Sequence, residues 1–541
     1  MSAGVLAIDL GTTGVKVAIV DATGTVVAGA GETFPTVHGP DGAAEQDAAT
    51  WWAAIGRCAQ RVVAAAGGPS AVDLVTVTAQ YMSLVAVDAR GDALAPVVMW
   101  MDRRGAAHHP GRQWDETADL EALVAWIERH GIPTGGADSI GQLAFVRAER
   151  PEVWARAAAF VQPVDHLLAR LTGVVAATQN SAFPLLLTDN RTWGTPRYDD
   201  ELISRAGFDR DELLGRLPRL APFGEPRGEL TAAAAEHLGL RTGVVVAGGT
   251  IDTTTSAVGT GAVGEGDLGV VIGTTAVVLA HLASRGHDLA HGITSAPSPV
   301  PGSAVVIAEN GVGGKALDAF VSGLVAADDG LTLLAPSTTA DTFAAVVELA
   351  AGSPAGANGV LFAPWLVGAM APSFDPVVRG AFVGLGVSTT RADLARAVLE
   401  GVACNLARLV PHVAALAAGG PPDGGSAAER PIVFGGGGAS SALWGQLLAD
   451  VTGRRVQRLA EPRFTNVRGA AFVAMAEQGR IGWGDIGGLL VVAAEHEPDA
   501  QLHHRYAQQT AALELLQQNL GALHRMWEHP QPGAAAQGAH P

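Results

Sequence analysis

Over its first 80 or so residues the chain alternates short apolar runs with polar turns, which predicts β-strands interrupted by one helix. Residues 5–24 read VLAIDLGTTGVKVAIVDATG, and the two apolar runs around Gly-Thr-Thr-Gly predict a β-hairpin followed by a second turn at 21–24. Residues 50–66 have the apolar spacing of a helix, which a Gly-Gly-Pro sequence should end. Strands are expected at 72–77 and 84–87.

The rest of the chain predicts a longer series of elements. In the first half these are largely helices over 115–173 with a break at 131–133, a loop at 218–226 and a buried strand at 244–247. The second half should contain strands at 270–279, 304–308 and 432–434, an amphipathic helix over 391–410 and a surface loop at 419–430. It should end in a helix over 501–527 and a disordered tail at 529–541. Pro411 should kink or end the helix before it, although the helical pattern resumes to residue 418.

The Gly-Thr-Thr hairpin pattern occurs twice. Residues 268–280 read LGVVIGTTAVVLA, in which an apolar run again meets Gly-Thr-Thr and continues as a second apolar run. Two similar hairpins so far apart predict a duplicated fold with a nucleotide held between its halves. Glycine is dense near 258–266, where we place the boundary. The second hairpin has no acid equivalent to Asp9, so only the first copy is expected to hold a metal ion.

Composition narrows the class of protein. A chain of 541 residues with 48% apolar content is long enough for two large domains with buried cores. The formal charge of −18 argues against nucleic acid or an anionic membrane surface as a partner. Two cysteines, Cys58 and Cys404, exclude a disulfide framework and a zinc quartet. We find no signal peptide and no long apolar run, and we therefore expect a cytoplasmic protein.

The first hairpin also suggests chemistry. Its loop offers backbone N–H groups, two threonine hydroxyls and Lys16, all of which suit phosphate oxygens. Asp9, beside the loop, suits a Mg²⁺ ion that bridges phosphates. The alternative is an ordinary Gly-Thr turn with a solvated acid. Lysine occurs only at positions 16 and 315, so a general replacement of lysine by arginine is an alternative explanation for Lys16. The sequence GVGGKAL around Lys315 does not have the spacing of a Walker A loop.

A second glycine-rich segment reads FGGGGASSALWGQLLADVTGRRV at residues 434–456. Glycines between a strand and a helix allow a ligand to approach the helix N-terminus, although a tight strand–helix connection would need them too. The whole string resembles the adenosine-binding segment of the FGGY carbohydrate kinases. The resemblance covers roughly residues 4–480 and is closest to xylulokinase-like members. It rests also on AAEQDAATWW at 43–52, VVMWMDRRG at 97–105, AGGTIDTTTSAVGTG at 247–261 and DPVVRGAFVGLGVSTTRADLARAVLEGVA at 375–403.

The resemblance implies a fold and an activity. The fold would be a duplicated, actin-like (ribonuclease H-like) α/β ATPase, with ATP and sugar in the cleft between its halves. Residues 1–257 would form the N-terminal domain, 258–485 the C-terminal domain, and 486–541 a helix and a disordered tail. The reaction would be ATP-dependent phosphorylation of a ketopentose such as D-xylulose. Alternatives are a kinase of another ketose or polyol and a non-catalytic, actin-like nucleotide-binding regulator. A homodimer is the oligomer that we consider.

The resemblance also implies residue roles. Asp252 would be the general base and would contact the sugar, although Thr253–Thr255 after it also fit a helix N-cap. Asp9 would hold Mg²⁺. ATP would contact three groups of residues: Gly11, Thr12, Thr13 and Lys16 at one end of the polyphosphate, Gly273, Thr274, Thr275 and Gly313 at the other, and Gly436, Gly437 and Ser440 at the adenosine. The sugar would contact Gln80, Tyr81, Met82, Trp100 and Asp102. Asp102 could equally form a surface ion pair with Arg103 or Arg104, and Trp100 could lie in the core.

The sugar side departs from the family pattern in three places. Gln80-Tyr81-Met82-Ser83 stands where xylulokinases usually have Gln-Met-His-Gly, so the sugar-contacting histidine is replaced by Met82. The family's Gly-Glu-Arg-x-Pro is replaced by a sequence without charges at 368–372. The lysine expected near residue 141 is absent. The ATP side therefore matches the family more closely than the sugar side does.

Overall fold

The computed structural model describes residues 3–113, 116–325, 339–419 and 430–526. The chain divides into two compact units, each with its own sheet and core. Unit 1 consists of Met1–Gly259, Ser295–Val305 and Asn466–Leu489, and unit 2 consists of Thr260–Thr294, Val306–Thr465 and Leu490–Pro541. The expected surface loop at 419–430 and the expected tail at 529–541 fall almost wholly outside the described residues.

Unit 1 contains a seven-stranded sheet in which three antiparallel strands are followed by parallel ones and, at the far edge, by the antiparallel strand β12. The predicted hairpin is confirmed, because β1 and β2 pair antiparallel and Asp9 lies directly opposite Lys16. β6 runs parallel to β1, and both β13 and β14 run parallel to β6. The strands are β1 (Gly4–Leu10), β2 (Gly14–Val20), β3 (Val26–Thr33), β6 (Val72–Ala79), β12 (Gly228–Glu229), β13 (Val245–Val246) and β14 (Thr250–Ile251).

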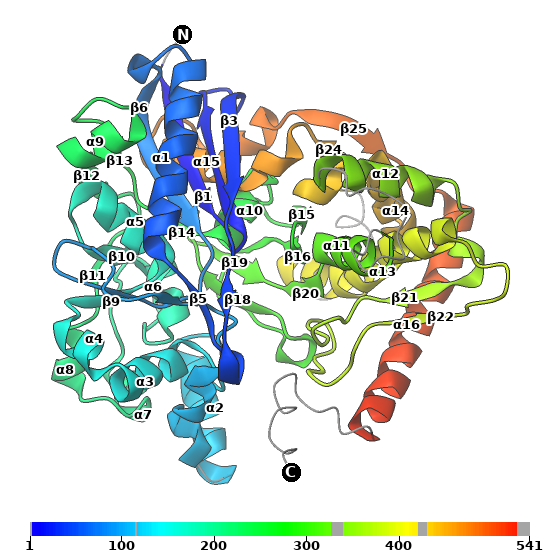
Figure 1. Ribbon diagram of the computed structural model, residues 1–541, viewed down its shortest axis with the longest axis horizontal. Helices are drawn as coiled ribbons and strands as arrows, with labels where there is room; N and C mark the ends of the chain where they lie inside the picture. Colours follow the sequence, from blue (N-terminus) through cyan, green and yellow to red (C-terminus); the bar gives the residue numbers. More distant parts are fainter. Residues whose placement is uncertain (1–2, 114–115, 326–338, 420–429, 527–541) are drawn as a thin grey trace, which may run out of the picture. The chain divides into compact units, whose positions relative to one another are not determined.

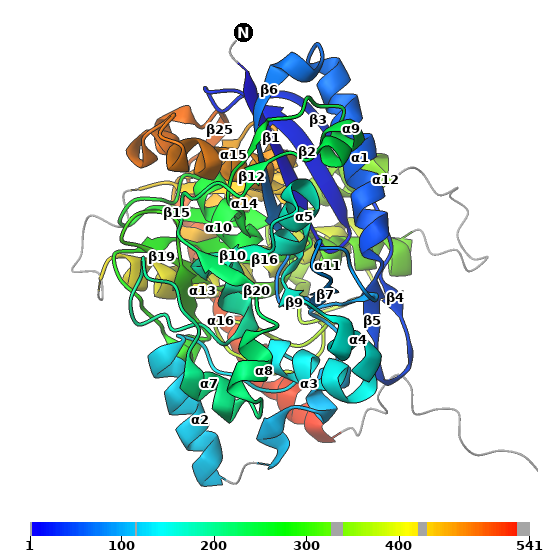
Figure 2. The ribbon, with the colours of Figure 1, turned by 90° about the vertical axis from the view of Figure 1, so that its left-hand side faces the viewer.

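The predicted helix after this hairpin is also confirmed. It is α1 (Ala48–Ala65), which lies along β2 and β3 (Figures 1 and 2). Asp47 caps its N-terminus by accepting a hydrogen bond from the Ala49 N–H. Trp51, Ile55 and Val62 recur at helical spacing and are buried, which fixes the face that packs on the sheet.

The remaining elements of unit 1 surround this sheet or form a smaller cluster beside it. The strands are β4 (Val37–His38), β5 (Ala44–Gln46), β7 (Val85–Val87), β8 (Val97–Val98), β9 (Ala159–Val161), β10 (Ala176–Thr178) and β11 (Arg219–Ala221). The helices are α2 (Glu116–Arg129), α3 (Ser139–Glu149), α4 (Pro151–Arg156), α5 (Pro163–Thr172), α6 (Gln179–Ala182), α7 (Asp200–Arg205), α8 (Arg210–Leu214), α9 (Ala232–Leu238), α10 (Asp252–Gly259) and α15 (Thr465–Glu477).

Unit 2 repeats the strand order of unit 1. Its sheet begins with the antiparallel strands β20, β16 and β15, continues through the parallel strands β23 and β24, and ends at β25. The duplication predicted from the two Gly-Thr-Thr hairpins is therefore confirmed. The strands are β15 (Leu268–Ile272), β16 (Thr275–Leu279), β20 (Glu309–Val312), β23 (Ile432–Gly435), β24 (Val456–Leu459) and β25 (Val492–His496).

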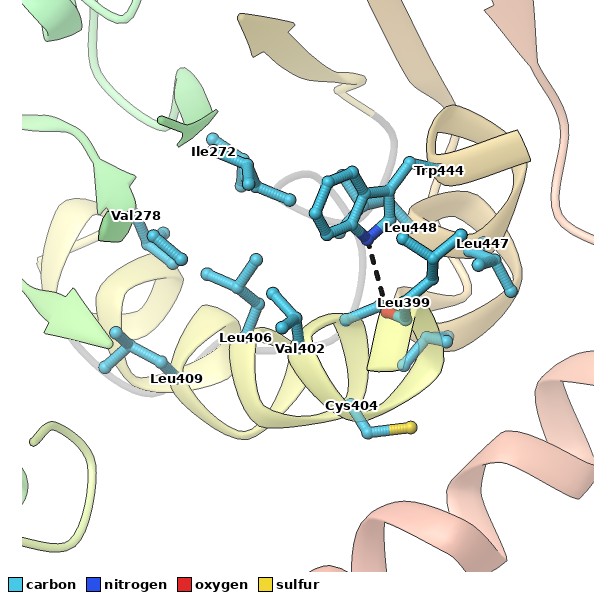
Figure 3. Packing of buried hydrophobic residues seen from close by; sticks show 14 of the residues in the cluster. Ile272, Val278, Leu399, Val402, Cys404, Leu406, Leu409, Trp444, Leu447 and Leu448 are labelled. Carbon is cyan, nitrogen blue, oxygen red and sulfur yellow. Dashed lines mark hydrogen bonds between the residues drawn. The ribbon is translucent and has the colours of Figure 1, made fainter. Parts of the chain in front are cut away.

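The core of unit 2 forms where α13 and α14 pack on this sheet. In Figure 3, Trp444 of α14 lies over α13, and its indole N–H donates a hydrogen bond of 3.2 Å to the Leu399 carbonyl. The other elements of this unit are α11 (Gly314–Phe320), α12 (Thr339–Ala351), α13 (Arg391–Ala417), α14 (Ala442–Thr452), α16 (Ala500–Met526), β17 (His281–Leu282), β21 (Leu361–Ala363) and β22 (Ala381–Val383). Two further strands, β18 (Thr294–Pro297) and β19 (Ala304–Ile307), include the residues at which the chain passes from one unit's range to the other's.

One prediction about local structure was wrong, and one was confirmed in part. α13 runs through Pro411 to Ala417, so the predicted continuation of the helical pattern to residue 418 is confirmed and the alternative that the helix ends at Pro411 is not. Val410 and Val413 are buried on either side of the proline, which is itself exposed. Packing on both sides outweighs the roughly 3 kcal/mol that a proline costs inside a helix. Residues 218–226 are not only a loop, since β11 lies there and pairs in parallel with β10. Both cysteines are buried and free, and within the described residues no helix is long and apolar enough to span a membrane.

Candidate functional site

Three of the predicted site segments meet at one edge of the unit 1 sheet. β1 ends at Leu10, β6 at Ala79 and β14 at Ile251, and these residues are aligned across three adjacent parallel strands. The Gln80 N–H donates a hydrogen bond of 2.8 Å to the Leu10 carbonyl and so extends the alignment beyond the strands. Carboxyl ends of parallel strands are where open α/β sheets bind ligands. The loop at 11–14, residues 80–82 and Asp252 therefore lie side by side.

Asp252 is half-buried and is the first residue of α10, directly after β14. Two polar side chains hold the backbone on either side of it. Asn180 accepts a hydrogen bond of 3.0 Å from the Ile251 N–H and donates one of 2.9 Å to the Thr254 hydroxyl. The Thr78 hydroxyl donates to the Thr250 carbonyl at 3.0 Å. Because these contacts fix the strand–helix junction, they also fix the position from which the Asp252 carboxylate projects.

α10 is also held from its other side by a close helix crossing. A Cβ atom on Gly469 of α15 would lie only 1.9 Å from the Thr255 carbonyl, so only glycine fits there. The positive end of the α10 dipole lies at Asp252, which favours a carboxylate over a neutral acid at that position. The base and N-cap interpretations of Asp252 both fit this placement.

Asp9 is buried beneath the first hairpin loop. It is 3% exposed, and its carboxylate lies 3.5 Å from Lys16 Nζ across the β1–β2 pair, while the Lys16 side chain is 47% exposed. The Asp9 carboxylate is buried and its ion pair with Lys16 is long, so its oxygens offer the hard ligand that Mg²⁺ prefers. The residues present at this position fit a magnesium–phosphate group.

The loop at 11–14 is organised by contacts that the sequence did not reveal. The Gly11 N–H closes the turn by donating to the Gly14 carbonyl at 2.9 Å, so it is already engaged within the hairpin. The Trp100 indole N–H donates to the Thr12 hydroxyl at 3.0 Å. That contact leaves the hydroxyl's own proton to donate elsewhere. Trp100 is 46% exposed, so the alternative that placed it in the core is wrong.

Gln46 and Trp51 support the same loop and were missed as functional residues. The Gln46 side-chain amide donates to the Thr12 carbonyl at 2.7 Å and accepts from the buried Trp51 indole at 2.8 Å. Both residues lie in the EQDAATWW segment that carried part of the family resemblance. The family resemblance therefore marked the segment that holds Gln46 and Trp51. Their role was missed because it depends on the long-range contact between Gln46 and Thr12.

Asp102 forms the ion pair with Arg104 that the sequence offered as an alternative, but its carboxylate is fully buried and not at the surface. Its carboxylate accepts hydrogen bonds from the Arg104 guanidinium and from the Ala44 N–H at 2.9 Å. Arg104 also pairs with Glu45, which in turn pairs with Arg150. This network ties β5 to the segment after β8. Sugar contact by Asp102 remains a prediction.

The three predicted sugar residues after β6 have different environments. Gln80 is buried and accepts a hydrogen bond of 3.1 Å from the Ser83 hydroxyl. Tyr81 lies next to α10, because its phenol oxygen is 3.4 Å from the Thr253 hydroxyl. Met82 has a φ of +60°, which is uncommon for a residue other than glycine and indicates a strained turn. Gln142 holds this turn through a 3.0 Å hydrogen bond to the Met82 carbonyl.

The predicted phosphate residues of unit 2 also form one cluster. The Gly273 N–H donates to the Thr275 carbonyl at 2.8 Å, and the Gly313 N–H donates to the Thr274 carbonyl at 3.0 Å. A Cβ atom on Gly313 would lie 2.7 Å from the Thr275 carbonyl, so the two segments can approach only because this residue is glycine. Thr274 is exposed at the tip of the hairpin.

The glycine-rich segment after β23 lies beside this hairpin. Gly436 has a φ of +80°, and its Cβ would lie 2.6 Å from the Ile272 carbonyl. Gly437 is different, because a Cβ there would meet nothing within 4 Å. Gly437 and Ser440 are exposed, and Ser441 caps α14 by accepting from the Trp444 N–H. The exposed backbone at Gly437 has open space beside it, which leaves room for a nucleotide to approach.

Comparisons with known proteins point to one family. The N-terminal domain of the FGGY family of carbohydrate kinases matches residues 4–259, and the C-terminal domain matches residues 268–477. A xylulose kinase of Escherichia coli is 28% identical over 95% of this chain and 99% of its own. A glycerol kinase of Xanthobacter autotrophicus is 31% identical over 88% of this chain and 90% of its own. The crystal structure of xylulose kinase from Rhodospirillum rubrum has a TM-score of 0.74 at 28% identity, covering 96% and 99%.

These likenesses extend over nearly the whole chain and include both units. The duplicated strand order, together with the structural match, confirms the predicted α/β fold of two actin-like ATPase domains.

Proposed function

Because this chain belongs to the FGGY family of carbohydrate kinases, we propose that it transfers the γ-phosphoryl group of Mg-ATP to a sugar hydroxyl, with Asp252 as general base. That it is a carbohydrate kinase follows from the family itself. The finer proposal rests on one observation above all. Asp252 opens α10 directly after β14, beside the loops that follow β1 and β6.

The role of Asp252 is to accept the proton of the attacking hydroxyl. Asp252 is half-buried, and the Asn180 and Thr78 contacts hold the backbone of Ile251 and Thr250 before it, so the point from which its side chain projects is fixed before the sugar binds. General-base catalysis of this kind contributes roughly 10²–10⁴-fold to rate. Mg-ATP, when bound, supplies the phosphoryl group, and its metal ion neutralises charge on the phosphate oxygens. Asp9 would hold the ion, and Lys16 would pair with phosphate.

Each unit has its own candidate contacts for a nucleotide. In the N-terminal domain, which we assign to 1–257, the Thr12 and Thr13 hydroxyls would donate to phosphate oxygens. In the C-terminal domain, which we assign to 258–485, the hairpin at 273–275 would contact phosphate, with Gly313 behind it. Gly437 and Ser440 would border the adenosine. Support comes from the exposure of Thr274, Gly437 and Ser440.

For the substrate we propose a ketopentose such as D-xylulose, phosphorylated at its terminal hydroxyl. The support is that a xylulose kinase is 28% identical over almost the full length, although a glycerol kinase is similarly related. Met82 lacks the donor of the histidine usual at its position, and a site without a polar partner discriminates weakly at one hydroxyl. We also propose that the enzyme acts in the cytoplasm on free sugars, as a single chain or a homodimer.

An ATP-consumption screen tests this proposal. We expect D-xylulose to give a higher kcat/KM than D-ribulose, L-ribulose, xylitol or glycerol. Met82→His should raise kcat/KM for D-xylulose more than for xylitol, because it restores a hydrogen-bond donor beside Tyr81. If only glycerol or a hexose supports turnover, the pentulose assignment is wrong and the kinase class survives. If Mg-ATP binds but no acceptor is phosphorylated, the chain is a nucleotide-binding regulator.

A further inference from the structure

Three side chains able to bind a metal converge in unit 2, and none of them is a residue assigned above to nucleotide or sugar. Asp288 and His291 belong to a short turn before β18, and His412 projects from α13. One ligand atom of each residue lies within 4.8 Å of the other two. Asp288 and His291 are only three residues apart, and the fold brings the distant His412 to them.

The distances suit a small metal ion. The His291 Nδ1 atom lies 2.7 Å from Asp288 Oδ2, and the His412 Nδ1 atom lies 4.0 Å from the same oxygen. Zinc bonds of about 2.0–2.2 Å in tetrahedral geometry require ligand atoms roughly 3.3–3.5 Å apart. One measured separation lies below that range and the other above it. The shorter one is a hydrogen bond, which a bound ion would replace, and both ring nitrogens must shift to hold one ion. The two imidazole rings are stacked, with centroids 3.6 Å apart and planes 24° apart, so one ring must turn about its side-chain bonds before both nitrogens point at one ion.

The turn that carries two of the ligands is well held. The backbone N–H and carbonyl of Asp288 both pair with Ile293, at 2.8 and 2.9 Å. The turn also lies close to α13, because a Cβ atom on Gly286 would be 3.4 Å from a Leu416 methyl group, one helical turn from His412. The side chains of Asp288, His291 and His412 are 30, 37 and 34% exposed, so an ion can reach them from solvent.

We propose that Asp288, His291 and His412 bind one divalent transition-metal ion of the zinc type, with solvent completing its coordination. Two imidazoles and one carboxylate favour zinc and its neighbours over Mg²⁺ or Ca²⁺, which prefer oxygen ligands. The bound ion links the turn at 288–293 to α13. Its role is structural, because its ligands are none of the residues assigned to phosphoryl transfer, and this inference does not rest on the proposed reaction.

The test is a titration of the metal-stripped, full-length protein with Zn²⁺, followed by calorimetry. We expect about one ion per chain, and Co²⁺ used as a spectroscopic probe should give the absorption bands of a tetrahedral site. His412→Ala and His291→Ala should each weaken binding at least about tenfold, since even the loss of an outer-shell partner typically costs that much. His504→Ala, which removes an exposed histidine of α16, is the matched control and should bind as the wild type does.

Two results would overturn the proposal. One is wild-type Zn²⁺ binding weaker than about 100 µM. The other is Zn²⁺ affinity that is the same in both histidine variants as in the wild type and the control. Asp288→Asn is a second variant, which keeps the side-chain volume, and it should also lose the Co²⁺ spectrum. It decides the test if either histidine variant folds poorly.

Discussion

The side-chain carbonyl of Asn180 accepts a hydrogen bond of 3.0 Å from the backbone N–H of Ile251, the residue immediately before Asp252. Asn180 is fully buried, and its amide also donates to the Thr254 hydroxyl at 2.9 Å and to the Pro297 carbonyl at 2.7 Å. One side chain thus bridges both flanks of the junction that carries the proposed base. We regard Asn180 as a positioning residue for Asp252.

Asn180→Ala should lower kcat by more than tenfold while leaving the KM for ATP within a few-fold. The substitution leaves the Ile251 N–H without its acceptor, which also costs about 1–3 kcal/mol of stability. Asn310→Ala is the matched control, since Asn310 is equally buried in unit 2 and its amide donates to two backbone carbonyls. Equal losses of kcat in both variants, at equal folded fraction, would show that the effect is general destabilisation.

Trp100→Phe should raise the KM for Mg-ATP about two- to tenfold, the range expected for loss of one hydrogen bond to Thr12. The melting temperature should hardly change, because the indole is 46% exposed. The measurement is initial rate against ATP at saturating sugar. A variant that raises only the KM for sugar would contradict the role in the phosphate loop and favour the predicted sugar contact of Trp100.

Glu477 should make stability depend on pH. It lies in α15, accepts a hydrogen bond of 3.0 Å from the Gly224 N–H, and burial raises its pKa from 4.5 to about 7. Between those values the folded state keeps a proton that the unfolded chain has lost, so the stabilising contribution declines as pH rises through this window. Above about pH 7 no further change is expected from this group.

Glu477→Gln keeps the acceptor oxygen and the shape but cannot titrate. The stability of this variant relative to the wild type should therefore increase from pH 4.5 to 7, by up to about 3 kcal/mol. Thermal unfolding of both proteins across this pH range is the measurement. A relative stability that stays constant over the range would contradict the raised pKa.

Much of the fold was predictable because it depends on local patterns. The two Gly-Thr-Thr hairpins gave the duplication, and β1 is a nearly unbroken apolar run that only a buried strand explains. The sequence left open whether the helix ends at Pro411, because the cost of a proline is local, whereas the burial of Val410 and Val413 is a property of the whole unit. β11 was missed because its partner strand lies far away in the sequence.

The candidate site was only partly predictable. Asp9 stands near the end of a predicted strand, so the sequence could place it at a sheet edge. Asp252 follows the short strand β14, which was not predicted, and its role came from the family resemblance. The burial of Asp102 could not be foreseen, because it depends on Arg104 and a backbone N–H contributed by Ala44. The same holds for Gln46, whose partner in the phosphate loop is Thr12. Such contacts join segments whose spacing in sequence carries no signal.

The most direct test of the account is the Asp252→Asn variant, which removes the proton acceptor while keeping volume and hydrogen-bonding shape. With the best sugar substrate, kcat should fall at least about 100-fold, the size of a general-base contribution. Calorimetric titration should give a Kd for Mg-ATP within a few-fold of the wild type. If the variant instead keeps a kcat near that of the wild type, Asp252 serves as the N-cap of α10 and the proposed mechanism is wrong.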